Sequence, residues 1–255
     1  MNNNVLSLQK LIKDYQTLSL IELDKVQLLN RQDTKFVFNQ GYLPLILKRI
    51  KPFYNILDIR NERVFTYKTS YFDTDKFLFY NQHHNEFRNR FKVRYRKYSS
   101  NSNSFFEIKI KNNKNRTVKK RLMVEDIKES LGDQEKEMVN DVIGLSTCHL
   151  SNKLNIKFLR ITLTDKQLNE RLTIDTNLTA QNGTISKIFD NLIISEIKQK
   201  KYYPKSPYIQ ILRELKIPEM RFSKYCMGML HVNKGIKYNR FKPKLSHINK
   251  ILTQA

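Results

Sequence analysis

Five short segments of this chain alternate basic and apolar residues with a period of two, and several of them also carry a glutamate. They span residues 92–96, 107–111, 118–122, 170–175 and 196–200. Because a β-strand sends residues i, i+2 and i+4 to one face, each segment gathers its charged side chains on one side. Strands of this kind, placed side by side, would form a cationic wall with a few carboxylates. Such a wall could hold a polyanion and a metal ion.

The predicted strand faces bring specific charged residues together. They pair Arg94 with Arg96, Glu107 with Lys109 and Lys111, Lys119 with Arg121, and Glu196 with Lys198 and Lys200. Taken singly, any of these segments is more typical of a solvated strand face, and an isolated glutamate is more typical of a surface ion pair. The repetition of the pattern, together with the motif order described below, favours the binding wall.

The overall charge supports an anionic partner. The 255 residues include 47 Lys and Arg against 24 Asp and Glu, which gives a formal net charge of +23. A charge of this size predicts binding to nucleic acid, an acidic membrane or phosphate-rich small molecules, although a general bias of composition is an alternative explanation. The six glycines occur singly, without a glycine-rich phosphate loop. Side chains must therefore bind any phosphate.

The cysteines and the distribution of apolar residues indicate in which compartment the protein works. The two cysteines have no spacing typical of a disulfide framework or a zinc site, which predicts reduced thiols. We find no apolar stretch of membrane-spanning length and no signal-peptide hydrophobic region. These features predict a cytoplasmic protein, and any coupling to a membrane would need a partner protein.

Hydrophobic periodicity predicts one α+β unit with roughly eight mostly antiparallel strands. The strands are expected at 31–38, 64–73, 91–98, 105–111, 117–123, 155–164, 171–176 and 192–200. Helices are expected near the N-terminus and at 19–29, 41–51, 75–87, 125–145 (broken near Gly132), 204–215 and 222–232. We expect an N-terminal helical segment over 1–30, a main domain over 31–232 and a basic, at most partly ordered tail over 233–255. Helices should pack around the sheet with its charged faces turned inward.

Short motifs along the chain resemble those of a known family in type and order. They are RQDTKF at 31–36, SYFDT at 70–74, KVRYR at 92–96, EIK at 107–109, DTNL at 175–178, EIK at 196–198 and FSKY at 222–225. Together they resemble the VTC domain, the polyphosphate polymerase domain of the vacuolar transporter chaperone complex, which also has free-standing bacterial members. This domain is part of the triphosphate tunnel metalloenzymes, or CYTH-like superfamily. The resemblance covers about residues 31–230.

The resemblance implies an antiparallel eight-stranded β-barrel that forms a tunnel lined by basic side chains. It implies that ATP binds with its phosphates inside, beside a divalent Mn²⁺ or Mg²⁺ ion. The γ-phosphate would be transferred to a growing polyphosphate or pyrophosphate chain, with release of ADP. Phosphoryl transfer depends mainly on positioning and charge neutralisation. It therefore needs no protein nucleophile, and the sequence offers no convincing nucleophilic triad.

The resemblance also implies roles for individual residues. The catalytic, phosphate-binding set comprises Lys35, Arg94, Arg96, Lys109, Lys119, Arg160, Arg171, Lys198 and Lys224. Their neighbours Lys111, Arg121, Lys200 and Ser223 would bind substrate. Glu196 would bind the metal, because a hard carboxylate oxygen suits Mg²⁺ or Mn²⁺. Glu107 is a second candidate, either as an outer carboxylate of the metal site or as a salt-bridge partner.

Two other functions stay open at this point. The ExExK signature of the broader CYTH group is absent, which lowers the odds of a small-triphosphate hydrolase or a cyclase, but an inorganic or nucleoside triphosphatase could use the same tunnel. A tunnel open at only one end would favour hydrolysis. A non-catalytic polyphosphate-binding or nucleic-acid-binding protein is the third hypothesis. The absence of a recognised nucleic-acid motif and of tryptophan disfavours nucleic acid.

Overall fold

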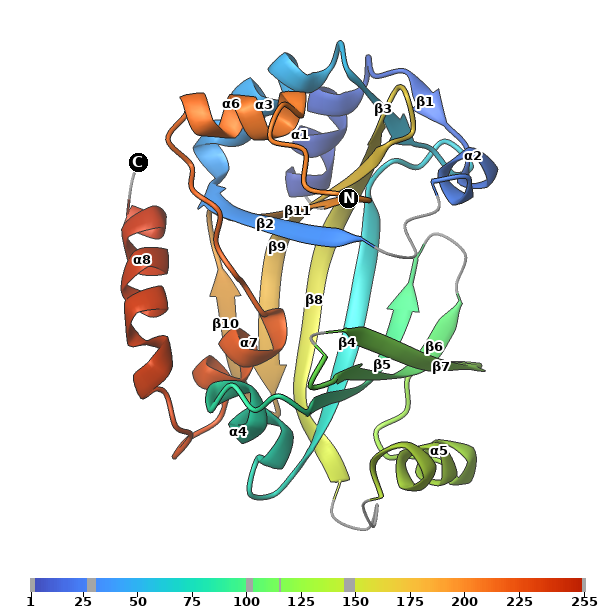
Figure 1. Cartoon of the computed structure of the whole chain (residues 1–255), viewed down its shortest axis with the longest axis vertical. Helices are drawn as coiled ribbons and strands as arrows, with labels where there is room; N and C mark the ends of the chain where they lie inside the picture. The colour runs from blue at the N-terminus through green and yellow to red at the C-terminus, as the bar shows by residue number, and fades with distance from the viewer. Residues whose placement is uncertain (1–2, 27–30, 100–102, 115, 145–149, 254–255) are drawn as a thin grey trace.

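One large sheet with helices around it forms the body of the protein (Figure 1). The computed structural model describes residues 3–26, 31–99, 103–114, 116–144 and 150–253. The helices are α1 (Asn3–Ile12), α2 (Leu20–Asp24), α3 (Leu43–Ile50), α4 (Leu78–His84), α5 (Asp133–Ile143), α6 (Pro207–Glu214), α7 (Lys224–Val232) and α8 (Lys242–Thr253), with 3₁₀ turns η1 (Gln40–Tyr42) and η3 (Asn239–Phe241).

The sheet contains 11 strands, and all but one of its strand pairs are antiparallel. The strands are β1 (Thr17–Leu18), β2 (Gln32–Asn39), β3 (Tyr54–Leu57), β4 (Phe65–Thr74), β5 (Arg90–Tyr98), β6 (Ser104–Lys111), β7 (Thr117–Val124), β8 (Leu150–Asp165), β9 (Glu170–Asn182), β10 (Ile185–Phe189) and β11 (Leu192–Gln199). The main path runs β2-β11-β9-β8-β4-β5-β6-β7, with β1, β3 and β10 attached beside it. The predicted α+β fold with a mostly antiparallel sheet of about eight main strands is confirmed, but the sheet is not closed into the expected barrel.

The two faces of the sheet differ sharply in chemistry. On one face the apolar residues of β2, β8, β9 and β11 pack with α1, α3 and α6 into a single core. The same face of β5 and β6 packs against α5 in a second core. The alternate residues of these strands carry the charged side chains, as the period of two predicts. Helices α1, α3, α5 and α6 therefore cover this apolar face. The opposite face carries the charged side chains and, over another part of β8, β9 and β11, a third apolar core with α7 and α8.

The sheet curls so that its charged face is concave. β2 and β7 are the end strands of the main path, and in the described part of the chain they do not pair with each other. Charged side chains from the two ends of this strand path nevertheless interact. Glu196 on β11 and Lys35 on β2 both act on the pKa of Lys109 on β6. In Figure 1, β2 crosses one end of the long strands while β5, β6 and β7 bend across the other end. The sheet thus forms an open, tunnel-like enclosure rather than a barrel closed by strand pairing.

Helix α7 packs onto the concave side of this sheet. Its Gly228 lies so close to β8 that an added Cβ would come within 2.8 Å of Ile156 Cδ1 and 2.9 Å of Leu154 Cδ1. Glycine is therefore required for the close approach of this helix. Side-chain caps fix the two helices next to the site. Ser223 Oγ accepts from the Cys226 amide at 3.2 Å, and Asp73 accepts from the first-turn amides of α4.

Several elements differ from the sequence-based expectation. Strands β1, β3 and β10 were not expected. The two-residue turn that joins β9 to β10 begins with Gly183, whose φ of 54° is typical of hairpin turns. Helix is found only over Asp133–Ile143 within the predicted range 125–145, and α2 ends at Asp24. The C-terminal tail is not merely partly ordered, because it contains α8 with Ile248 and Ile251 buried.

Candidate active site

The first part of the concave face is a carboxylate held between two lysines. Lys35 on β2 lies opposite Glu196 on β11, and Lys35 Nζ lies 2.8 Å from Glu196 Oε2. Lys198 Nζ lies 3.4 Å from the other oxygen, Oε1. Burial by itself would raise the pKa of Glu196, but the charges of Lys198 and Lys35 lower it well below its usual value. Glu196 is therefore an ionised carboxylate in a cationic setting.

The second part is a buried aspartate shared by two cations. Arg160 on β8 donates from Nε and Nη2 to Asp175 on β9, at 2.6 and 2.8 Å. Lys224, at the start of α7, donates to the same carboxylate. The guanidinium of Arg160 also lies over the rings of Tyr67 and Phe158, 4.7 and 5.2 Å from their centroids. Both cations are thus fixed in direction before any ligand arrives.

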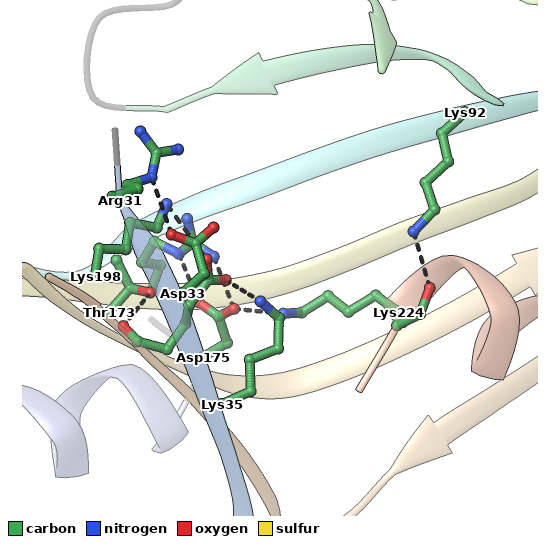
Figure 2. A network of polar contacts seen from close by, with 11 residues as sticks. Arg31, Asp33, Lys35, Lys92, Thr173, Asp175, Lys198 and Lys224 are labelled. Carbon is green, nitrogen blue, oxygen red and sulfur yellow. Dashed lines mark hydrogen bonds and ion pairs between the residues drawn. The ribbon is translucent and has the colours of Figure 1, made fainter. Parts of the chain in front are cut away.

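Figure 2 shows how these side chains converge from different elements. Lys35 comes from β2, Lys198 from β11 and Lys224 from α7. Burial lowers the pKa of Lys198 and of Lys224, and the neighbouring carboxylates oppose this effect. A cluster of partly desolvated cations beside two ionised carboxylates is an arrangement that binds phosphate oxygens and a hard metal ion.

The third part lies on β5 and β6, on the opposite side of the enclosure. Arg94 donates to Glu107 Oε2 from Nε at 2.9 Å and from Nη2 at 2.6 Å. Its Nη1 donates to the hydroxyl of Tyr71 at 3.2 Å. Lys119 on β7 reaches the other oxygen of Glu107 at 3.2 Å. Burial would raise the pKa of Glu107, but Arg94 and its cationic neighbours lower it to about 2.

Lys92 and Lys109 extend this part of the wall, and among the described residues neither forms an ion pair with a carboxylate. They lie opposite each other on β5 and β6, and Lys92 Nζ donates to Ser223 Oγ at 3.1 Å (Figure 2). Burial, followed by the charges of Lys92 and Arg94, lowers the pKa of Lys109 to about 7. A lysine in this state gains stability from an anion placed beside it, which would restore its usual pKa.

The donor set fits a divalent metal at one position. Glu196 is a hard carboxylate on the concave face, and Mg²⁺ or Mn²⁺ is often held by one or two carboxylates plus phosphate oxygens and water. Glu107 does not fit this role, since it is 1% exposed and accepts two hydrogen bonds from the guanidinium of Arg94, whereas the side chain of Glu196 is 19% exposed. Within the described residues, no three or more His, Cys, Asp or Glu side chains are grouped so that they could hold a metal ion by themselves. Glu196 would hold the ion together with the substrate.

The structure brings most of the predicted site residues to the concave face. Arg96 donates from Nε to Thr69 Oγ1 at 3.2 Å, and Arg171 donates from Nη2 to the Leu23 carbonyl at 2.8 Å. Lys119 and Arg121 lie on the exposed end strand β7, where Arg121 covers the ring of Phe105 at 5.0 Å. Lys200 is not brought to the face, because β11 ends at Gln199 and Lys200 is exposed in the following bend.

Three residues of the site were missed by the sequence-based prediction. Lys92 lies two residues before Arg94 in the same alternating segment, so the period of two was a sufficient signal for it. Asp175 lies in the DTNL motif but was given no site role, and only the fold reveals that it joins Arg160 to Lys224. Tyr71 lies opposite Arg94 through the pairing of β4 with β5, which no local pattern could indicate.

Comparisons with known proteins agree with this architecture. A family model described as the VTC domain matches residues 30–233, whereas no curated protein matches the sequence. Among solved structures, the chain is similar to a putative adenylyl cyclase from Hippeastrum described as having a dominant triphosphatase activity. The TM-score is 0.51 with 13% identity, over 80% of this chain and 97% of that chain. At this identity the similarity supports a shared fold alone.

Two further structures show weaker similarity. A putative adenylate cyclase from Bacillus halodurans has a TM-score of 0.47 and 11% identity, over 76% of this chain and 95% of that chain. A putative adenylate cyclase from Vibrio parahaemolyticus has a TM-score of 0.45 and 10% identity, over 76% of this chain and 97% of that chain. Separately, none of the helices in the described ranges has the length and apolar character needed to cross a bilayer.

Proposed function

The chain belongs to the VTC domain family, and from this premise we propose that it is a divalent-metal-dependent polyphosphate polymerase. It transfers the γ-phosphate of ATP to the end of an inorganic phosphate chain and releases ADP. One observation supports the proposal: the charges of Glu196 on β11 and Lys35 on β2 act on Lys109 on β6, so cations from different strands act together across the enclosure. Such a gathering of cations suits a phosphate polyanion.

Different residues of the site would have different roles in the transfer. Arg94 and Arg160, each oriented by a carboxylate, would bind phosphate oxygens through their forked guanidinium groups. Lys35, Lys198 and Lys224 would neutralise charge near the transferred group, where positioning and electrostatics dominate the rate. Glu196 would hold a divalent ion, which when bound supplies charge stabilisation to the phosphoryl oxygens. None of these roles requires a covalent intermediate on the protein.

The alternative is a triphosphatase that uses the same face and transfers the phosphoryl group to water. The fold similarity to the Hippeastrum protein keeps this alternative open. The match to the VTC domain over residues 30–233 supports the polymerase instead.

Incubation of the protein with ATP, Mn²⁺ and a pyrophosphate primer tests the proposal, with products resolved on a gel stained for polyphosphate. We expect a ladder that is lost in Glu196→Gln and in Arg94→Ala. Lys187→Gln, on the exposed strand β10, is the matched control and should retain the ladder. Phosphate release without a ladder would favour the triphosphatase, and no turnover under several primer conditions would leave a non-catalytic binding protein.

A further inference from the structure

A pocket on the helix-covered face of the sheet lies apart from the candidate active site. Three connections form it: the link from α3 to β3, the turn from β8 to β9 and the segment that leads into α6. Figure 1 shows α3, β3 and α6 together at one end of the long strands. The cavity has a volume of about 470 Å³, which lies in the range of small-molecule sites. Glu170 lines it from β9 and faces the same side as Leu172, which belongs to the core beneath α1, α3 and α6.

Apolar and aromatic side chains form the walls of this pocket. Pro52 and Phe53 line it from the link between α3 and β3, and Tyr203 and Pro207 line it from the other side chain-bearing connection before α6 and from the start of that helix. Both aromatic side chains are accessible, with 46% of Phe53 and 53% of Tyr203 exposed. Nucleobases stack on aromatic side chains of this kind. The walls therefore suit a ligand with a flat ring.

Two buried carboxylates line the same pocket. Asp165 is 7% exposed and Glu170 is 4% exposed, and within the described residues neither forms an ion pair. Glu170 accepts hydrogen bonds from Ser206 Oγ at 2.8 Å and from Gln199 Nε2 at 2.5 Å, and Tyr54 also donates to it. Burial raises the pKa of the Asp165 carboxyl, although backbone amides oppose this effect. Because a carboxylate has about four acceptor positions, each can also accept from an N–H group of a ligand.

Hydrogen bonds link the three connections into one frame. The Lys166 amide donates to the Phe53 carbonyl at 3.0 Å, which joins the turn after β8 to the link before β3. The Tyr203 amide donates to Gln199 Oε1 at 3.0 Å, so the backbone of this residue is fixed while its ring lines the pocket. The pocket is therefore formed before a ligand binds, which lowers the entropic cost of binding.

Two lysines complete the lining of the pocket. Lys166 and Lys205 are both exposed, and in the described part of the chain neither pairs with a carboxylate. Their ammonium groups suit an anionic group such as phosphate. They also disfavour a basic peptide, which the carboxylates alone would suit. The ligand that fits this lining combines a flat ring, an N–H donor and a phosphate.

We propose that this pocket binds an adenine nucleotide at a site separate from the transfer site. The base stacks on the aromatic wall of Phe53 and Tyr203, and its exocyclic amino group donates to the buried carboxylates. The phosphate lies beside Lys205. A nucleotide with an oxygen atom in place of this amino group lacks the donor that the carboxylates require, so the site discriminates against it. The site is independent of the proposed function, because it uses none of the residues assigned to phosphoryl transfer.

Calorimetric titration with AMP tests the proposal without any need for turnover. Saturating tripolyphosphate is present throughout, so that the transfer site is already occupied. We expect the wild type to bind AMP at least about tenfold more tightly than inosine monophosphate, and we expect Tyr203→Ala and Lys205→Gln each to weaken AMP binding by about tenfold. Tyr238→Ala and Lys250→Gln are the matched controls, since both positions are exposed and neither lines the pocket. Both controls should keep the wild-type affinity.

Three results would overturn the proposal. No binding of AMP by the wild type under these conditions, with binding restored when tripolyphosphate is left out, would place the nucleotide at the transfer site. Equal affinities of the wild type, Tyr203→Ala and Lys205→Gln would mean that AMP binds elsewhere. Equal affinities for AMP and inosine monophosphate would exclude recognition by the carboxylates. Unchanged melting temperatures of the variants would show that a loss of binding is not a loss of folding. A failure of polymerase activity would contradict the proposed function and leave these binding results unaffected.

Discussion

Lys35 and Glu196 form an ion pair across β2 and β11, with Nζ and Oε2 separated by 2.8 Å. The pair joins a candidate phosphate-binding lysine to the candidate metal-binding carboxylate. Since Lys198 approaches the other oxygen of Glu196 at 3.4 Å, the carboxylate is neutralised while no metal is bound. An incoming metal–triphosphate complex would supply a cation for Glu196 and anions for the two lysines, so the three side chains exchange partners together.

The first prediction concerns Glu196. In Glu196→Gln, the side chain keeps its size but loses the charge that suits a divalent ion. We expect turnover at saturating ATP to fall by about 100-fold or more, since a bound metal contributes several kcal/mol to phosphoryl transfer. Steady-state rates as a function of Mn²⁺ concentration measure the effect. Wild-type rates and an unchanged Mn²⁺ dependence would show that Glu196 is not the metal ligand.

The second prediction concerns the buried pair of Arg94 and Glu107. Glu107→Gln leaves the guanidinium of Arg94 buried without its countercharge, so we expect the free energy of unfolding to fall by roughly 3 kcal/mol. Urea denaturation measures the change. Asp126→Asn is the control, because the pair of Asp126 with Lys97 is exposed and its loss should cost less than about 1 kcal/mol. Equal effects of the two substitutions would contradict a dominant role of the buried pair.

The third prediction is a proton linkage at Lys109. Burial and neighbouring cations lower its folded-state pKa from 10.5 to about 7. Between these values the unfolded chain binds the additional proton, so Lys109 makes the free energy of unfolding rise with pH across that window. A bound triphosphate should raise the pKa of Lys109, and binding at pH 8 should therefore take up protons.

Calorimetry of tripolyphosphate binding in buffers of different ionisation enthalpy measures this uptake. We expect proton uptake at pH 8 in the wild type and a smaller value in Lys109→Met, while Lys187→Gln should match the wild type. Identical uptake in Lys109→Met and the wild type would assign the titration to another group.

The fourth prediction concerns Asp175. Asp175→Asn leaves Arg160 and Lys224 as buried cations without a full countercharge, so the free variant should be less stable than the wild type. A triphosphate would replace the missing charge. We therefore expect tripolyphosphate to raise the melting temperature more in the variant than in the wild type. Thermal denaturation with and without ligand measures both effects.

The control for this experiment is Asp133→Asn, whose side chain is fully exposed beside Lys136. It should show the wild-type response to ligand. A variant that is destabilised but gains no more from tripolyphosphate than the wild type would mean that Arg160 and Lys224 do not bind phosphate.

Local patterns predicted the strand faces well because the period of two is a property of the backbone. Arg94 and Lys109 lie on the face that their alternation indicated. The ends of the strands were predicted less accurately, since Lys200 follows the last residue of β11 and is exposed. Helix α8 was not predicted, because its burial depends on contacts with distant residues, such as the hydrogen bond from Asn39 Nδ2 to the Ile251 carbonyl at 2.9 Å.

The partners of individual charges depend on strand register and could not be derived from composition or spacing. Glu107 was left open between an outer metal-site carboxylate and a salt-bridge partner, and register places it opposite Arg94, which favours the salt bridge. Register also brings Asp175 opposite Arg160. Such pairings between strands arise only when the sheet assembles.

The fate of the γ-phosphate tests the central claim most directly. Phosphorus-31 NMR of a reaction with ATP, Mn²⁺ and a pyrophosphate primer follows terminal, internal and free phosphate together. We predict that the signal of internal chain phosphate grows in step with ADP, while orthophosphate stays low. Orthophosphate that appears in equal amount to ADP, with no internal chain signal, would contradict polyphosphate synthesis and identify the protein as a triphosphatase.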